Sequence, residues 1–118
     1  MATIKNFTNI AQSKTLSEIL PIETADAIYP WRELIKDYDS VYVPEDMSNI
    51  GEEDIPCWSL ATLLDTLPPI EGFRPIIDLD VNLIRYEGNY RDKLCFNGNN
   101  LIDACYEMII KLNELKIL

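Results

Sequence analysis

Histidine is absent from this chain of 118 residues. Imidazole is the commonest general base near neutral pH and the commonest protein ligand for metals, so its absence argues against many hydrolytic and metal-dependent reactions. The sequence also lacks the motifs for nucleotide binding, for a nucleophilic serine and for a catalytic zinc ion. We therefore predict that the protein is not an enzyme and binds no cofactor. A carboxylate-dependent enzyme is the least favoured alternative.

Cysteine and long apolar runs are scarce. Only Cys57, Cys95 and Cys105 occur, without a Cys-x-x-Cys pair. The odd number argues against a disulfide framework, and we expect all three to be small hydrophobic residues of the core. No apolar run is long enough to cross a membrane, and the first residues lack the apolar stretch of a secretory signal. These features predict a cytoplasmic protein that does not bind membranes.

Basic residues are few: ten of them face twenty acidic residues, for a formal net charge of −10. The excess is concentrated in residues 15–54, which hold eleven acids and two bases, whereas residues 73–118 are nearly neutral. A segment of charge −9 repels nucleic acids and membrane surfaces and attracts basic partners. A solvated face that keeps the protein soluble is the simplest explanation. A charge-driven site for a basic protein partner is the alternative.

The N-terminal half carries the weaker secondary-structure signals. Apolar residues at helical spacing predict a short helix at the start of the chain. Thr15 and Glu18 form a capping-box pattern for a further helical turn, which a proline ends. Residues 26–31 and 40–45 are rich in β-branched or aromatic residues and could pair as an edge hairpin across residues 32–39. Alternatively, residues 32–39 form a single helical turn.

The C-terminal half follows an acidic loop and has clearer patterns. Leucines at helical spacing predict a helix over residues 59–67, with its serine as the N-cap and Trp58 as a hydrophobic staple. Alternating apolar and polar residues between 74 and 98 predict a three-stranded antiparallel meander. Asn100 is placed to cap a last helix over residues 101–118, whose apolar residues share one broad face.

Together these elements predict an α+β fold in a single domain over residues 1–118. Residues 15–54 form an acidic, partly irregular N-terminal segment, and residues 55–118 form a helix–meander–helix core. The three-stranded antiparallel sheet packs one face against the two main helices, while the N-terminal helical or irregular segment wraps an edge. The predicted core residues are Leu60, Leu63, Leu64, Leu67, Ile77, Leu79, Ile84, Phe96, Cys105, Ile109 and Leu112.

Aromatic residues occur among the acids of the N-terminal segment, and tyrosine and tryptophan are enriched where proteins bind one another. We predict a non-catalytic protein-interaction module that binds its partner through this acidic, aromatic surface. An acidic nucleic-acid mimic that inhibits a DNA-binding protein is the alternative. Partial cover of the core would also explain the aromatics. The predicted partner-binding residues are Tyr29, Trp31, Tyr42, Glu45, Asp46, Glu52, Glu53 and Asp54.

The last helix carries a second, narrower apolar stripe outside its main face. Tyr106, Ile110 and Ile117 form this stripe beside the acids of the helix. It faces either a second copy of the chain, in a homo-oligomer, or the N-terminal helix of its own chain.

A short acidic alternation at residues 78–82 has the look of a calcium-binding loop. Leu83 stands where such a loop needs a glycine, because the loop turns sharply at that position. Alternation along a strand explains the spacing of the acids, so we predict no metal site.

Three stretches, "AQSKTLSEILPIETADAIY" at residues 11–29, "PCWSLATLLDTLP" at 56–68 and "NLIDACYEMIIKLNELK" at 100–116, resemble a family of short uncharacterised proteins of gut Bacteroidetes. Members are often encoded among prophage or mobile-element genes. The resemblance covers most of the chain, and residues 31–54 match least. It implies a cytosolic accessory protein and favours binding to a host or phage protein. It supplies no assigned activity and no catalytic residue, and a family alone does not establish a function.

Overall fold

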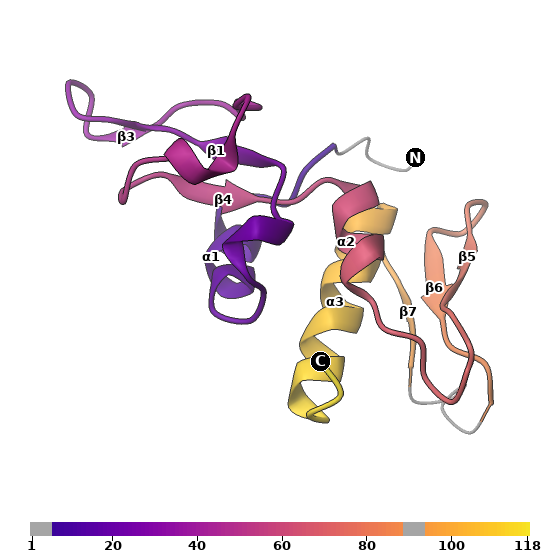
Figure 1. The fold of residues 1–118 in the computed structure, drawn as a ribbon. Coiled ribbons are helices and arrows are strands. Elements are labelled where there is room, and N and C mark those ends of the chain that lie inside the picture. Colours follow the sequence, from indigo (N-terminus) through magenta and orange to yellow (C-terminus); the bar gives the residue numbers. More distant parts are fainter. Residues whose placement is uncertain (1–5, 89–93) are drawn as a thin grey trace.

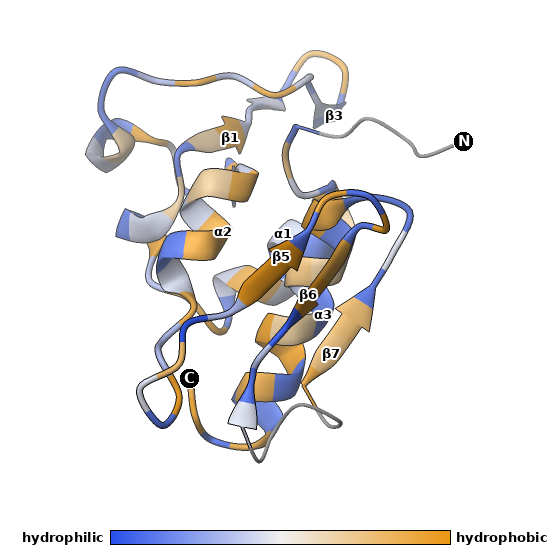
Figure 2. Ribbon diagram, turned by 90° about the vertical axis from the view of Figure 1, so that its right-hand side faces the viewer, coloured by the Kyte–Doolittle hydropathy of each residue, from blue (hydrophilic) through white to orange (hydrophobic). Residues whose placement is uncertain are grey.

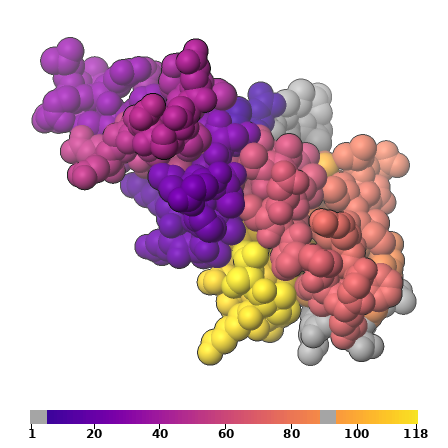
Figure 3. Space-filling view, viewed as in Figure 1, coloured from indigo at the N-terminus to yellow at the C-terminus, as the bar shows by residue number. Residues whose placement is uncertain are grey.

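The computed structural model describes residues 6–88 and 94–118, and it has the expected α+β composition (Figure 1). The molecule is elongated, with extents of 51 × 33 × 23 Å, and the acidic N-terminal segment forms one end while the sheet forms the other (Figure 3). Along the chain the described elements are α1 (Ile10–Ser17), η1 (Ile22–Thr24), β1 (Ala27–Tyr29), β2 (Trp31–Arg32), β3 (Asp37–Tyr38), η2 (Met47–Asn49), β4 (Ile55–Cys57), α2 (Leu60–Thr66), β5 (Ile76–Asp78), β6 (Leu83–Arg85), β7 (Cys95–Asn97) and α3 (Leu101–Glu114).

The predicted three-stranded antiparallel meander is confirmed as β5–β6–β7. Ile84 is the central residue of β6, lies opposite Ile77 and Phe96, and is fully buried. The sheet lies in front of α3 in Figure 2, and α3 contacts β6 and β7. Helix α2 makes its main contacts with α3 instead of with the sheet, which differs from the prediction that both helices cover one sheet face. The layers therefore run from sheet to α3 to α2.

Helix α3 begins as the sequence predicts and ends earlier. The Asn100 side chain accepts a hydrogen bond from the backbone N–H of Asp103 at 2.9 Å. At the other end, Lys116 adopts a φ of 60°, and the backbone N–H of Ile117 donates to the carbonyl of Leu112 at 2.9 Å. The N–H of Lys116 also donates to the carbonyl of Asn113 at 3.1 Å, and the two bonds make a Schellman motif, which satisfies the last carbonyls of the helix and reverses the chain. The predicted extension to residue 118 is therefore wrong.

The residues that precede α2, Trp58 and Ser59, stabilise the fold. The Ser59 side chain accepts from the backbone N–H of Thr62, so the predicted N-cap is confirmed. Trp58 is fully buried in the same core cluster as Leu63, and its indole N–H donates to the hydroxyl of Thr24 at 2.9 Å. The tryptophan therefore connects α2 to the N-terminal segment.

Most predicted core residues are buried or pack against the core, but Leu79 and Cys95 are exposed. Strand β5 ends at Asp78, so Leu79 falls in the following turn and is 74% exposed. Cys95 points away from the core because only the middle residue of the three-residue strand β7, Phe96, faces inward. The second turn of the meander lies partly outside the described residues.

Helix α1 begins earlier than the capping pattern of Thr15 and Glu18 suggested. Asn9 is the N-cap, and a capping box joins it reciprocally to Gln12 at 2.8 and 3.1 Å. Thr15 lies inside the helix, where its hydroxyl donates to the carbonyl of Ala11. The two-way bond of Asn9 and Gln12 satisfies helix donors one turn before Thr15, which explains the earlier start.

Strand pairing in the N-terminal segment also differs from prediction. Strand β1 pairs along its length with β4, which the sequence left at the end of a loop. Residues 40–45 contribute only a single bridge, between Tyr42 and Ile28. The hairpin instead forms within residues 31–38, where β2 pairs with β3, so residues 32–39 are not a helical turn.

Thr8 joins these N-terminal elements at a buried junction. Its N–H donates to the carbonyl of Trp58, and its hydroxyl accepts from the N–H of Trp58 at 3.1 Å and bonds to the Ser13 hydroxyl at 2.8 Å. The Tyr29 hydroxyl donates to the carbonyl of Thr8 at 2.7 Å. Helix α1, strand β1 and the end of β4 are therefore held in a defined arrangement, which sets the walls of the groove described next.

Candidate functional site

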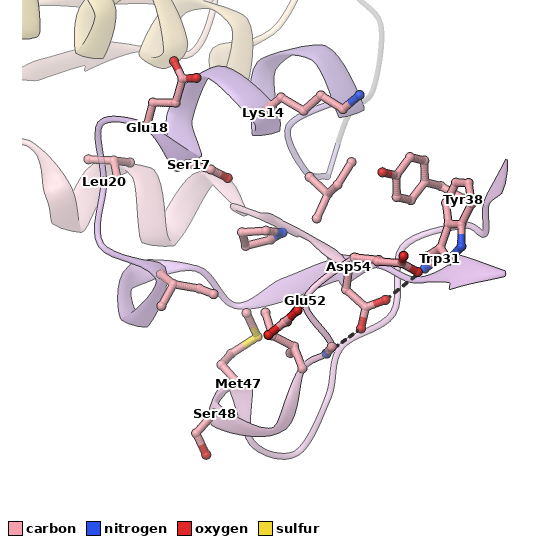
Figure 4. A pocket seen from close by; sticks show the side chains of 16 residues that line it. Lys14, Ser17, Glu18, Leu20, Trp31, Tyr38, Met47, Ser48, Glu52 and Asp54 are labelled. Atoms are coloured by element: carbon pink, nitrogen blue, oxygen red, sulfur yellow. Dashed lines mark hydrogen bonds between the residues drawn. The ribbon is translucent and has the colours of Figure 1, made fainter. Parts of the chain in front are cut away.

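A cavity of about 930 Å³ opens between α1, the base of the β2–β3 hairpin and the loop that leads into β4 (Figure 4). We call it the acidic groove. Its lining residues are Lys14, Ser17, Glu18, Leu20, Ile22, Trp31, Tyr38, Met47, Ser48, Ile50, Gly51, Glu52, Glu53, Asp54, Ile55 and Pro56.

The apolar part of the groove comes from several elements. Leu20 and Ile22 follow α1, Met47 and Ile50 belong to the loop, and Ile55 opens β4. Ile55 is buried, whereas Met47 and Ile50 are half-buried. The groove therefore offers apolar surface that the fold covers only in part, and such surface favours an apolar side chain of a ligand.

An aromatic pair closes one end of the groove. Trp31 and Tyr38 are opposite each other in the β2–β3 register, and their rings meet edge to face with centroids 5.0 Å apart. The Trp31 indole N–H donates to the Glu33 carboxylate at 2.9 Å, which fixes the ring. Beyond the pair, at the tip of the same hairpin, Leu34 and Ile35 project into solvent. The aromatic pair is thus a preformed, half-buried platform.

Three acidic side chains on the groove have carboxylates without a partner in the described chain. In the described chain, no hydrogen bond or ion pair reaches the carboxylates of Glu18, Glu52 or Glu53, and all three residues are exposed. Lys14 is the only basic residue among the described residues that line the groove. The groove therefore presents a negative field that the fold itself does not neutralise, which favours a cationic ligand.

Asp54 differs from the neighbouring acids because its carboxylate is occupied. One oxygen accepts from the backbone N–H of Trp31 and the other from that of Gly51, each at 2.9 Å (Figure 4). The N–H of Asp54 also donates to the carbonyl of Gly51. Asp54 thereby closes the loop on itself and ties it to β2, beside the aromatic pair.

The structure gathers half of the predicted partner-binding residues. Trp31, Glu52, Glu53 and Asp54 line the groove, and the other four do not: Tyr29, Tyr42, Glu45 and Asp46.

These four residues have other surroundings. Burial raises the pKa of Tyr29, whose hydroxyl is bonded to Thr8, and Tyr42 is exposed beside Ile28. Asp46 caps η2, and the hydrogen bond from the N–H of Ser48 lowers the pKa of its carboxyl group. Glu45 is exposed.

Two charged groove residues were missed by sequence reasoning: Lys14 and Glu18. Lys14 and Glu18 are four residues apart, a spacing that places side chains on one helix face. That spacing was visible in the sequence, but nothing in the sequence alone indicated that α1 faces the acidic loop.

The Tyr106, Ile110 and Ile117 stripe is not a continuous helix face, because Ile117 lies beyond the end of α3. Tyr106 and Ile117 pack against the core of their own chain. The role of the stripe in a homo-oligomer stays a prediction.

The two buried cysteines outside the groove are core residues with unreactive thiols. Burial raises the pKa of Cys57 and of Cys105 to about 12, so both thiols are protonated at neutral pH. Within residues 6–88 and 94–118, no three acidic or cysteine side chains converge as a metal-binding group. In the same ranges no helix is long and apolar enough to cross a bilayer.

The acidic groove is known from the structure of this chain alone. The family resemblance noted from the sequence stays a prediction. No protein-family model, no curated protein and no solved structure matches the chain.

Proposed function

We propose that the protein is a non-catalytic interaction module that binds a basic, partly apolar segment of another protein in the acidic groove. The observation that carries the proposal is the set of three unpaired carboxylates, Glu18, Glu52 and Glu53, on a cavity with an apolar floor. Its volume of about 930 Å³ lies within the range of roughly 300–1,000 Å³ common for ligand sites. The acids attract the partner, and the apolar and aromatic surface supplies burial.

The nucleic-acid mimic is the less favoured candidate. A mimic of duplex DNA needs a row of carboxylates on an outward face, where a basic cleft can receive them. Here the unpaired acids Glu18, Glu52 and Glu53 line a concave surface that also offers apolar side chains. This shape fits a peptide segment better than it fits the inside of another protein's cleft.

A cytoplasmic location is part of the proposal. Cys57, Cys95 and Cys105 are all free, and Cys95 is exposed. Free exposed thiols persist in reducing compartments such as the cytosol.

Titration with designed peptides tests the proposal. Trp31 lines the groove and Trp58 is fully buried, so a change in tryptophan emission reports chiefly on the groove. The probes are three hexapeptides, alternating leucine with lysine, leucine with glutamate, and serine with lysine. We expect saturable binding of the leucine–lysine peptide and much weaker binding of the other two.

A matched pair of variants locates the binding. The double variant Glu52→Gln, Glu53→Gln should weaken binding by about threefold to tenfold, the effect of removing two rim charges. The control Glu45→Gln, Glu107→Gln removes the same charge from exposed positions outside the groove and should bind as the wild type does. Equal weakening in both variants would show that only the net charge matters and would contradict the groove as the site.

A further inference from the structure

Lys14 occupies an unexpected place in the acidic groove. It is the only cation among the described lining residues, yet its ammonium group forms no ion pair with a carboxylate of the described chain. Its Nζ lies instead 5.8 Å from the centroid of the Tyr38 ring. Figure 4 shows the side chain extending from α1 toward Tyr38, away from Glu18. The groove's own cation is therefore held at the aromatic platform.

The contact between Lys14 and Tyr38 is weak by its geometry. A distance of 5.8 Å is close to the outer limit of about 6 Å for a cation–π interaction. Lys14 is also exposed, and its four-carbon side chain has several accessible rotamers. The ammonium group can thus leave the ring at little cost in free energy.

The platform, by contrast, is fixed. The Trp31 backbone N–H is bonded to Asp54, its indole N–H is bonded to Glu33, and its ring meets the Tyr38 ring edge to face. Helix α1 is also anchored, since Ser13 is bonded to Thr8 one residue before Lys14. Lys14 is therefore a flexible side chain on a fixed helix, and its ammonium group lies near a fixed aromatic ring that a ligand cation would use.

We propose that Lys14 is a built-in placeholder for a cationic side chain of the bound segment, which displaces it from the Tyr38 ring on binding. This inference rests on the function proposed above and adds its regulation: the chain's own lysine competes with the partner's lysine or arginine. The competition lowers the affinity for weakly basic segments and so raises the selectivity for segments that also bury an apolar side chain.

Removing the placeholder should strengthen binding. In Lys14→Met the helix propensity and the length of the side chain are nearly kept, but the positive charge is lost. We expect the leucine–lysine hexapeptide to bind about threefold to tenfold more tightly, from the loss of like-charge repulsion and of competition for the ring. Lys14→Arg keeps a cation on the ring and should bind as the wild type does.

The matched control is Lys111→Met on α3, which changes the net charge by the same amount at a position outside the groove. It should leave the affinity unchanged. Combining Lys14→Met with Tyr38→Leu should reduce the gain to the part that comes from like-charge repulsion, because the ring that both cations share is then absent. Thermal unfolding of each variant, followed by circular dichroism, confirms that the variants compared are folded.

The outcomes separate the two proposals. Binding by the wild type without a gain in Lys14→Met, or with an equal gain in Lys111→Met, overturns the placeholder and leaves the interaction module intact. A complete lack of binding by the wild type and by Lys14→Met overturns both. A gain in Lys14→Met that persists undiminished in the Tyr38→Leu background contradicts competition for the ring and also overturns the placeholder.

Discussion

Asp54 is the acid whose loss should affect folding most directly among the acids of the groove. Its two oxygens accept backbone N–H groups of Trp31 and Gly51 at 2.9 Å each. A hydrogen bond to a charged group contributes about 1.5–3 kcal/mol when buried. Asp54 is only half-buried, so solvent screening places each bond below that range. We expect Asp54→Ala to lower the free energy of unfolding by about 1.5–3 kcal/mol in total, for both bonds together.

The measurement is urea unfolding followed by circular dichroism and by tryptophan emission. For a chain of 118 residues, about 4 °C of melting temperature corresponds to 1 kcal/mol, so thermal unfolding should shift down by about 6–12 °C. Asp54→Asn keeps one carbonyl oxygen and should lose about half as much. The control Glu53→Ala removes a neighbouring acid that accepts no hydrogen bond in the described chain and should stay within about 0.5 kcal/mol of the wild type. Equal stability of Asp54→Ala and Glu53→Ala would refute the structural role assigned to Asp54.

Four further predictions concern the junction, the core and the cysteines. Thr8→Val removes the hydroxyl that accepts from the buried backbone N–H of Trp58, and it should lower the free energy of unfolding in urea by about 1–3 kcal/mol. Thr8→Ser keeps the hydroxyl and should keep most of the stability. Leu63→Ala creates a cavity at a fully buried site and should cost about 2–5 kcal/mol; a melting temperature near that of the wild type would remove it from the core. With a thiol reagent at pH 8, exposed Cys95 should react at once and the two buried cysteines only on unfolding. Because the buried thiols have a folded pKa of about 12 against an ordinary value near 9, the stability that they contribute is complete below about pH 9 and is lost as the pH rises toward 12, which alkaline unfolding curves would show.

The parts of the fold that could be predicted are those with local signals. Ser59 and Asn100 are N-caps whose side chains bond within three residues, and both helix starts are confirmed. The meander followed from alternation within short strands, which placed Ile77 and Ile84 toward the core. A cap or an alternation is encoded by neighbours in sequence, so a single sequence reveals it.

The parts that could not be predicted depend on distant residues. The pairing of β1 with β4 joins segments about 28 residues apart, and the Thr8 junction joins residue 8 to Trp58, 50 residues later. Pairing partners of this kind are chosen by the packing of the whole chain, because short strands such as β4 carry little pattern of their own. Leu79 is exposed because β5 is only three residues long and ends one residue before it, whereas Cys95 is exposed because it lies in β7 on the face opposite to Phe96.

The groove illustrates how a fold divides a run of identical charges into different roles. Glu52, Glu53 and Asp54 are adjacent in sequence and carry the same charge. Asp54 nevertheless accepts hydrogen bonds from two backbone N–H groups, while the two glutamates remain unpaired in the described chain. The stabilising acid holds the loop beside Trp31, and it therefore determines where the unpaired acids are displayed. A substitution at Asp54 should then weaken peptide binding through disorder of the loop, and a substitution at Glu52 or Glu53 should weaken it through charge alone. Peptide affinity measured against salt concentration separates these effects, because only the loss of a charge reduces the salt dependence without changing the stability.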